Sequence, residues 1–174
     1  MLNLWAPIFR LLQPFAEWAS TTPMNHVMTN EVWAWPMAET IHFIGLAFLV
    51  GAISILDLRL LGMAKRLPIE PLHRLVPWGI GGFVANAITG FLFYTGDPLQ
   101  FNSNPMFQWK MVFVLLAGIN IMYFYVGGVF TKVAALGPGA DAPLSARIVA
   151  GSSLLLWFGV MTFGRMLPFV GNAF

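Results

Sequence analysis

The chain has 174 residues, of which 58% are hydrophobic and 9% are charged, and its mean hydropathy is +0.75. An average soluble domain carries about 25% charged residues, so this composition argues against a free-standing soluble globule. The net charge of +2 rests on too few basic residues for a nucleic-acid-binding surface. The sequence contains no cysteine, which excludes disulfides, iron–sulfur clusters and a cysteine nucleophile.

The first 35 residues predict an amphipathic helix that lies in the membrane interface. Apolar residues recur at helical spacing, and polar residues occupy the opposite face. The apolar set is Leu2, Trp5, Phe9, Leu12 and Ala16, and the polar set is Asn3, Arg10, Gln13 and Glu17. The start is uncharged and prolines interrupt the apolar run, so the segment does not fit a signal peptide.

Four later stretches are apolar and long enough to cross about 30 Å of hydrocarbon as helices. They cover about residues 36–56, 75–94, 109–131 and 148–167. Helices are expected because unpaired backbone groups are costly in lipid. We therefore predict an all-α integral membrane four-helix bundle over residues 36–174, preceded by the interfacial segment 1–35.

Basic residues gather in two of the connecting loops. The first loop holds Arg59, Lys65, Arg66 and Arg74, and the second is bounded by Lys132 and Arg147. Loops rich in lysine and arginine face the cytoplasm. Both termini are then expected on the outer, periplasmic side, as is the loop at 97–108.

Four ionisable residues are expected to form one layer near the outer surface: Glu39, His42, Lys110 and Arg165. Ionisable groups within a span are costly and are functional candidates. Glu39 and His42 are three residues apart and share a helix face, which suits a proton relay or a metal or haem ligand. The alternative is a Glu39–Arg165 ion pair. Lys110 opens a helix, where the dipole opposes a cation, so it needs Glu39, Asp97 or a bound anion as partner.

The remaining polar residues of the spans favour structural interpretations. Asn86 and Asn120 lie at matching depth and predict an Asn–Asn hydrogen bond, and Gly82 and Gly90 flank Asn86 in a small-residue stripe for close helix packing. At the end of the first span, Asp57 and Arg59 predict a local pair or a solvated corner. His73 is too far from His42 for both to ligate one haem.

The segment MNHVM at 24–28 is a candidate copper site. In an extended chain Met24, His26 and Met28 would point to one side. Thioether and imidazole ligands suit Cu(I), and His42 is a further candidate ligand. The alternative is that these methionines only fill gaps at an interface.

Several segments resemble a family of small, uncharacterised four-span bacterial inner-membrane proteins. They are ETIHFIG at 39–45, LDLRLLG at 56–62, LHRLVPW at 72–78, Asn104-Pro105 with Lys110, and Gly164-Arg165. More distantly, the first span is similar to copper-resistance D-type and cytochrome b561-like membrane bundles, in which an early histidine precedes small residues. That similarity implies copper handling or haem binding. The chain departs from the paired histidines of b561-like bundles, because only His42 lies clearly inside a span.

Three functions follow as hypotheses. The first is a small redox-associated subunit of electron transport that binds haem b or a quinone through His42, Glu39, Lys110 and Arg165. The second is copper binding or transport, and the third is a non-catalytic anchor or assembly subunit. No hydrolase or phosphate-binding motif is present, so an enzyme acting alone is not expected. The expected partners are the lipid bilayer, other membrane or periplasmic redox proteins and a second copy of the chain.

Overall fold

The computed structural model describes residues 5–170, and within them every regular element is a helix. Four of the helices are long: α4 (Ala34–Leu61), α6 (Val76–Gly96), α8 (Pro105–Val126) and α10 (Leu144–Met166). They mark four segments that are long and apolar enough to cross a membrane. The predicted all-α membrane bundle is confirmed, and the chain has the architecture of a multi-pass membrane protein.

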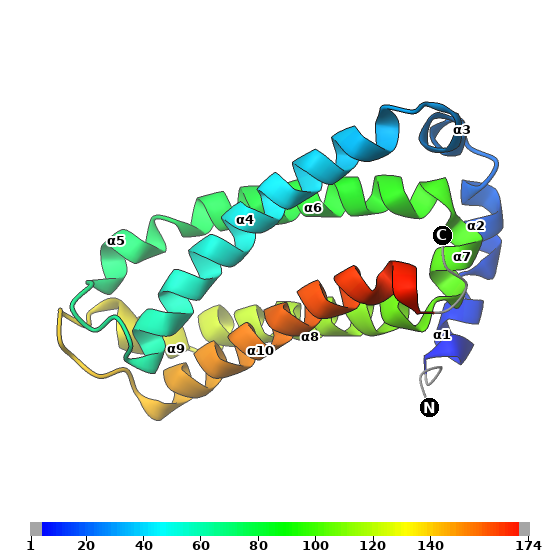
Figure 1. Ribbon diagram of the computed structural model, residues 1–174. Coiled ribbons are helices and arrows are strands. Elements are labelled where there is room, and N and C mark those ends of the chain that lie inside the picture. Colours follow the sequence, from blue (N-terminus) through cyan, green and yellow to red (C-terminus); the bar gives the residue numbers. More distant parts are fainter. Residues whose placement is uncertain (1–4, 171–174) are drawn as a thin grey trace.

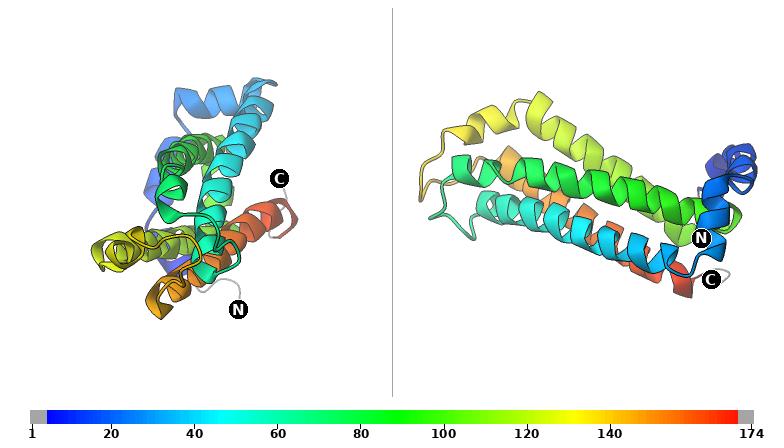
Figure 2. Two further views of the ribbon diagram at one scale, coloured as in Figure 1. Left: turned by 90° about the vertical axis from the view of Figure 1, so that its left-hand side faces the viewer. Right: turned by 90° about the horizontal axis from the view of Figure 1, so that it is seen from above.

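The long helices form two antiparallel pairs (Figure 1). Helix α4 packs along α6, α8 packs along α10, and α10 also contacts α4. The pairs lie closer together at the end where α5 (Ile69–His73) and α9 (Val129–Ala134) are found, here called the α9 end. The opposite end, called the α7 end, carries α7 (Pro98–Ser103) and three short helices of the N-terminal segment, α1 (Ala6–Arg10), α2 (Gln13–Ala19) and α3 (Pro23–Asn30). Figure 2 shows the bundle end-on from the α9 end and from above.

Glycines allow α4 and α6 to approach closely. A Cβ atom on Gly45 would lie 2.9 Å from the Gly82 carbonyl oxygen and 2.7 Å from the Asn86 amide nitrogen. A Cβ atom on Gly82 would lie 2.7 Å from the Leu49 backbone nitrogen and would also press on the Gly45 carbonyl. Such distances leave no room for a side chain at the crossing. The predicted role of the stripe in close packing is therefore confirmed at Gly82, whereas a Cβ atom on Gly90 would make only an ordinary contact.

The third long helix ends earlier than the sequence predicted. Helix α8 stops at Val126 instead of continuing to 131, because Gly127 follows and Gly128 adopts a left-handed conformation with φ of 71°. The chain then turns into α9. A left-handed glycine, Gly62 with φ of 93°, likewise ends α4.

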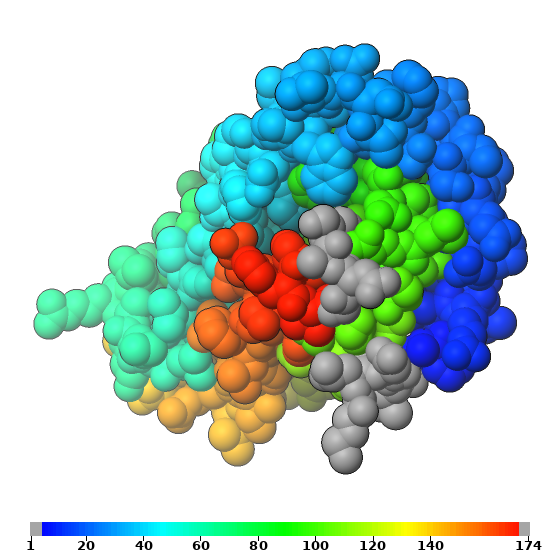
Figure 3. Space-filling model, turned by 45° about the vertical axis from the view of Figure 1, so that its right-hand side comes forward, coloured from blue at the N-terminus to red at the C-terminus, as the bar shows by residue number. Residues whose placement is uncertain are grey.

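Three short helices replace the single interfacial helix expected in the first 35 residues: α1 (Ala6–Arg10), α2 (Gln13–Ala19) and α3 (Pro23–Asn30). Each has a proline in its first turn, and proline cannot continue a preceding helix. The expectation of one helix was therefore wrong, although Leu2 and Asn3 lie outside the described residues. Ala16 is fully buried, whereas Leu12 is 45% exposed, so the expected apolar face is not continuous. Figure 3 shows these helices along one side of the α7 end.

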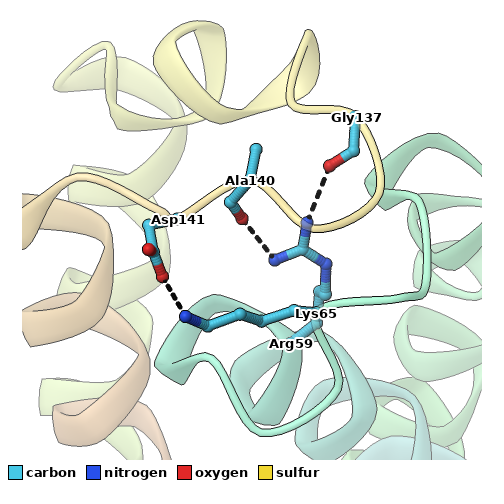
Figure 4. A network of polar contacts seen from close by, with 5 residues as sticks. All are labelled: Arg59, Lys65, Gly137, Ala140 and Asp141. Atoms are coloured by element: carbon cyan, nitrogen blue, oxygen red, sulfur yellow. Dashed lines mark hydrogen bonds and ion pairs between the residues drawn. The ribbon is translucent and has the colours of Figure 1, made fainter.

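The two basic loops lie together at the α9 end, and Arg59 joins them (Figure 4). Its buried guanidinium donates to three backbone carbonyl oxygens: Leu67 at 2.6 Å, Gly137 at 3.1 Å and Ala140 at 3.2 Å. The expected pairing of Arg59 with Asp57, or a solvated corner, is therefore wrong. A charged donor with a planar fork satisfies several carbonyls at once, and this fixes the loop after α4 to the loop before α10.

The same loops share one exposed ion pair. The Lys65 ammonium lies 2.5 Å from the Asp141 carboxylate, and the Gly139 backbone nitrogen donates to the Lys65 carbonyl at 2.7 Å. The hydrogen bond and the charge of Lys65 hold the pKa of Asp141 below its ordinary value of 3.8. A carboxyl whose pKa is depressed by folding stabilises the fold above its unfolded pKa and stops doing so as the pH falls through its folded pKa.

We therefore expect Asp141→Asn to lower the melting temperature slightly at neutral pH. The difference from the wild-type protein should stay constant down to about pH 5 and disappear below pH 3.8. The effect is small because the pair is exposed to water. Melting of both proteins in detergent across this pH range measures it. A difference that grows on acidification would contradict the assignment.

Candidate functional site

His42 lies on α4 between the α7 end and the crossing with α6. The half-buried ring places Nδ1 2.7 Å from Thr89 Oγ1 on α6, and it packs against Phe93 with ring centroids 5.5 Å apart. Gly90 leaves space beside the ring, because a Cβ atom there would lie 3.9 Å from His42 Cε1. The imidazole is therefore held in one orientation by neighbours on α6.

The hydrogen bonds of Thr89 favour one tautomer of His42. Thr89 Oγ1 lies 2.7 Å from the Ala85 carbonyl oxygen, which can only accept, so the single hydroxyl hydrogen of Thr89 is directed there. Nδ1 of His42 then donates to Thr89. In the neutral ring this leaves the lone pair on Nε2, where it can bind a metal ion or accept a hydrogen bond.

Lys110 brings a positive charge towards this histidine from α8. It lies within electrostatic range of His42, and its side chain passes Gly164 of α10, where a Cβ atom would lie 3.6 Å from Lys110 Nζ. Within residues 5–170 no carboxylate is within ion-pair distance of Lys110, so the expected partner Glu39 or Asp97 does not pair with it. A partly buried cation without a counter-ion favours the binding of an anionic or carbonyl oxygen.

Glu39 and Arg165, the other two members of the expected layer, are both exposed. The Arg165 guanidinium lies 5.5 Å from the ring centroid of Phe169. No ion pair joins Glu39 to Arg165 in the described part of the chain. The structure thus places Lys110 within electrostatic range of His42 and leaves Glu39 and Arg165 exposed on the bundle.

Asn104, which follows α7, links the start of α8 to the end of α10. Its side-chain oxygen accepts from the Met106 backbone nitrogen at 2.9 Å and so caps α8. Its amide nitrogen donates to the carbonyl oxygens of Leu167 at 3.1 Å and Val170 at 2.9 Å, beyond the end of α10. This buried residue therefore positions α10 beside the start of α8. An Asn-Pro pair before an apolar run is the sequence signal that could have identified it.

The expected copper segment is helical rather than extended. Met24, His26 and Met28 belong to α3, and positions two residues apart on a helix point to different sides. Met28 is buried, whereas Met24 and His26 are exposed. The expectation that all three share one side of an extended chain is wrong. Among the described residues, no group of three or more histidine and carboxylate side chains is arranged to hold a metal ion.

The two asparagines in the spans do not bond to each other, contrary to the prediction. Asn86 donates to the Gly82 carbonyl of its own helix at 2.9 Å. Asn120 on α8 donates to the Val149 carbonyl of α10 at 3.1 Å. Each amide is thus bonded to a backbone carbonyl, one in its own helix and one across the α8–α10 pair.

A second polar position, Asp57, lies in a cavity that the sequence analysis missed. The cavity measures about 240 Å³ and is lined by all four long helices. Asp57 is buried, and its Oδ2 has no hydrogen-bond partner among the described residues. Ser153 and Asn120 also line the cavity. An acidic residue in an apolar stretch is the sequence signal that could have identified this position. The sequence instead favoured an ion pair between Asp57 and the nearby Arg59.

His73 lies at the α9 end and is engaged by aromatic residues. Its Nε2 is 3.0 Å from the Tyr125 hydroxyl oxygen, and its ring stacks on Phe130 with centroids 4.5 Å apart. These contacts join α5 to α8 and α9. His73 is thus separated from His42 by most of the length of the bundle (Figure 1).

Comparison with known proteins identifies a family without an assigned activity. No curated protein and no solved structure matches the chain, so similarity to copper-resistance D-type or cytochrome b561-like proteins is not shown. The matching family model, described as a family of unknown function (DUF6644), covers residues 15–170. That range includes all four long helices, the His42 and Lys110 side chains, and Asp57. The chain therefore belongs to the uncharacterised family DUF6644.

Proposed function

We propose that this protein is a small redox-associated membrane subunit that binds a quinone through His42 and Lys110. The observation that carries the proposal is an oriented imidazole within electrostatic range of a partly buried lysine that lacks a carboxylate partner in the described chain. Ionisable side chains within a span are costly, and those without a structural partner are candidates for function.

The chemistry of the two side chains suits both redox forms of a quinone headgroup. The Lys110 ammonium can donate to a quinone carbonyl oxygen. Nε2 of His42, which carries the lone pair when Nδ1 donates to Thr89, can accept from a quinol hydroxyl. The electron chemistry belongs to the quinone, and the chain orients the headgroup and holds a proton at Nε2.

Haem b is the second candidate, favoured by the same free Nε2, which could ligate iron while Lys110 faces a propionate. The quinone is preferred because the described chain offers no second imidazole beside His42. His26 is exposed on α3, and His73 is bonded to Tyr125 at the far end.

We further propose that the protein lies in a bacterial inner membrane with its basic loops in the cytoplasm. The two loops that Arg59 joins contain most of the basic residues, and such loops are retained on the cytoplasmic side. The His42–Lys110 site would then lie nearer the periplasmic side. Its partners would be membrane or periplasmic redox proteins that exchange electrons with the bound quinone.

The test is the cofactor content of the protein purified from its native membranes in mild detergent. We expect quinone in the organic extract of the wild-type protein, at least a tenfold reduction in His42→Ala and Lys110→Met, and no change in His26→Ala, which alters an exposed histidine. Spectra of the oxidised and dithionite-reduced protein test for haem in the same samples. A Soret band lost in His42→Ala would replace quinone with haem, and wild-type protein without either cofactor would overturn the proposal.

A further inference from the structure

The cavity beside Asp57 holds a carboxyl group with an unused oxygen. Asp57 is 6% exposed and lies in the last turns of α4, and its Oδ2 accepts no hydrogen bond from the described residues. The Ser153 side chain of α10 faces the carboxyl. A buried carboxylate that lacks a cation and leaves one oxygen unpaired is expensive, so a ligand that supplies a charge and a hydrogen bond to that oxygen would be stabilised there.

The basic and titratable groups nearest to this carboxyl are already engaged elsewhere. Arg59 directs its guanidinium at the carbonyls of the two loops, and Lys65 pairs with Asp141. His73 and Tyr125 bond to each other. The described part of the chain therefore offers Asp57 no cation of its own.

The cavity is amphiphilic along its length. Its α9 end contains the carboxyl of Asp57 and the hydroxyl of Ser153. Its other end, nearer the middle of the long helices, is lined by apolar and aromatic side chains that include Leu49, Ala117 and Trp157. The volume of about 240 Å³ suits a small organic molecule, with one polar end and one apolar end.

We propose that this cavity binds a lipophilic primary amine in its protonated form, with the ammonium group on Asp57 and the apolar body towards Trp157. An anion would be repelled by the carboxylate, and a hydrocarbon would leave Oδ2 unpaired. The ammonium group supplies both a charge and a hydrogen bond to that oxygen. This site is separate from His42 and Lys110, and it does not depend on the proposed quinone.

Two ligands of equal size test the proposal with full-length protein in lipid nanodiscs. The amine is 4-phenylbutylamine, and the neutral control is pentylbenzene, in which a methyl group replaces the amine. We expect the wild-type protein to bind the amine, measured by equilibrium dialysis. Asp57→Asn should weaken amine binding at least tenfold and leave pentylbenzene binding unchanged. Glu70→Gln, which removes an exposed carboxyl at the same end, should change neither.

A second variant keeps the test valid if Asp57→Asn does not fold. Ala117 is buried and lines the apolar end of the cavity, so Ala117→Leu fills that space and leaves Asp57 in place. We expect it to fold and to lose both ligands. Equal affinity of wild-type protein for the amine and pentylbenzene, as a permanently protonated Asp57 would give, overturns the proposal. Full amine binding by either variant overturns it as well.

Discussion

Arg59→Ala is expected to lower the free energy of unfolding by about 3 kcal/mol or more, because hydrogen bonds from a charged donor contribute about 1.5–3 kcal/mol each. The buried guanidinium makes three such bonds, to the carbonyls of Leu67, Gly137 and Ala140. Its loss releases the loop after α4 from the loop before α10 and so weakens the contact between the two helix pairs.

Unfolding of the purified protein by titration with sodium dodecyl sulfate, followed by circular dichroism, measures this loss. Arg59→Lys should recover only a minor part of the stability, because an ammonium group cannot reach three carbonyls with the geometry of a planar fork. Lys65→Ala removes a neighbouring cation from an exposed pair, and it should change the free energy by less than about 1 kcal/mol. A similar loss in Arg59→Ala and Lys65→Ala would mean that Arg59 does not join the loops.

The bundle could be predicted from the sequence because lipid leaves few alternatives. An apolar stretch that crosses hydrocarbon must satisfy its backbone internally, so length and composition are enough to place four helices. The predicted helix boundaries were wrong where a single glycine or proline determines the backbone conformation. The third span ends at Gly127, and Gly128 is left-handed, which hydropathy does not register. The prolines of the first 35 residues likewise divide a predicted helix into three.

The candidate site was predicted only in part, because depth in the membrane can be deduced from sequence but helix rotation cannot. Glu39, His42, Lys110 and Arg165 were expected in one layer on that basis. Of these, only Lys110 lies within electrostatic range of His42, while Glu39 and Arg165 are exposed. The hydrogen-bond partner of His42 is Thr89, which is uncharged and was therefore not a candidate in the sequence.

The environment of Asp57 could not be predicted, because it depends on where Arg59 goes. Two residues of opposite charge that lie two positions apart suggest a pair. On a helix, however, positions two apart point to different sides. Arg59 instead reaches loop carbonyls that lie about 80 residues further along the chain, and this leaves Asp57 in the cavity. Contacts at such sequence separation are visible only in the folded chain.

Gly82→Ala is expected to destabilise the protein by about 1–3 kcal/mol, the usual cost of adding a methyl group where a packed interface has no room. Its Cβ atom would lie 2.7 Å from the Leu49 backbone nitrogen and against the Gly45 carbonyl, so α4 and α6 must move apart. Both contacts are backbone atoms, which cannot rotate away as a side chain can. Gly81→Ala is the matched control, because a Cβ atom there would meet nothing within 4 Å.

This separation should also reach the candidate site, because the same helices hold His42 and Thr89. The 2.7 Å contact between the imidazole and the hydroxyl lies about one to two turns from the Gly45–Gly82 crossing. Gly82→Ala is therefore expected to lose bound quinone together with stability, whereas Gly81→Ala, with alanine's higher helix propensity, should keep both. Detergent unfolding and quinone extraction on the same preparations test this linkage. Full quinone content in a destabilised Gly82→Ala protein would mean that quinone binding at His42 does not depend on the helix crossing, and this would contradict the prediction.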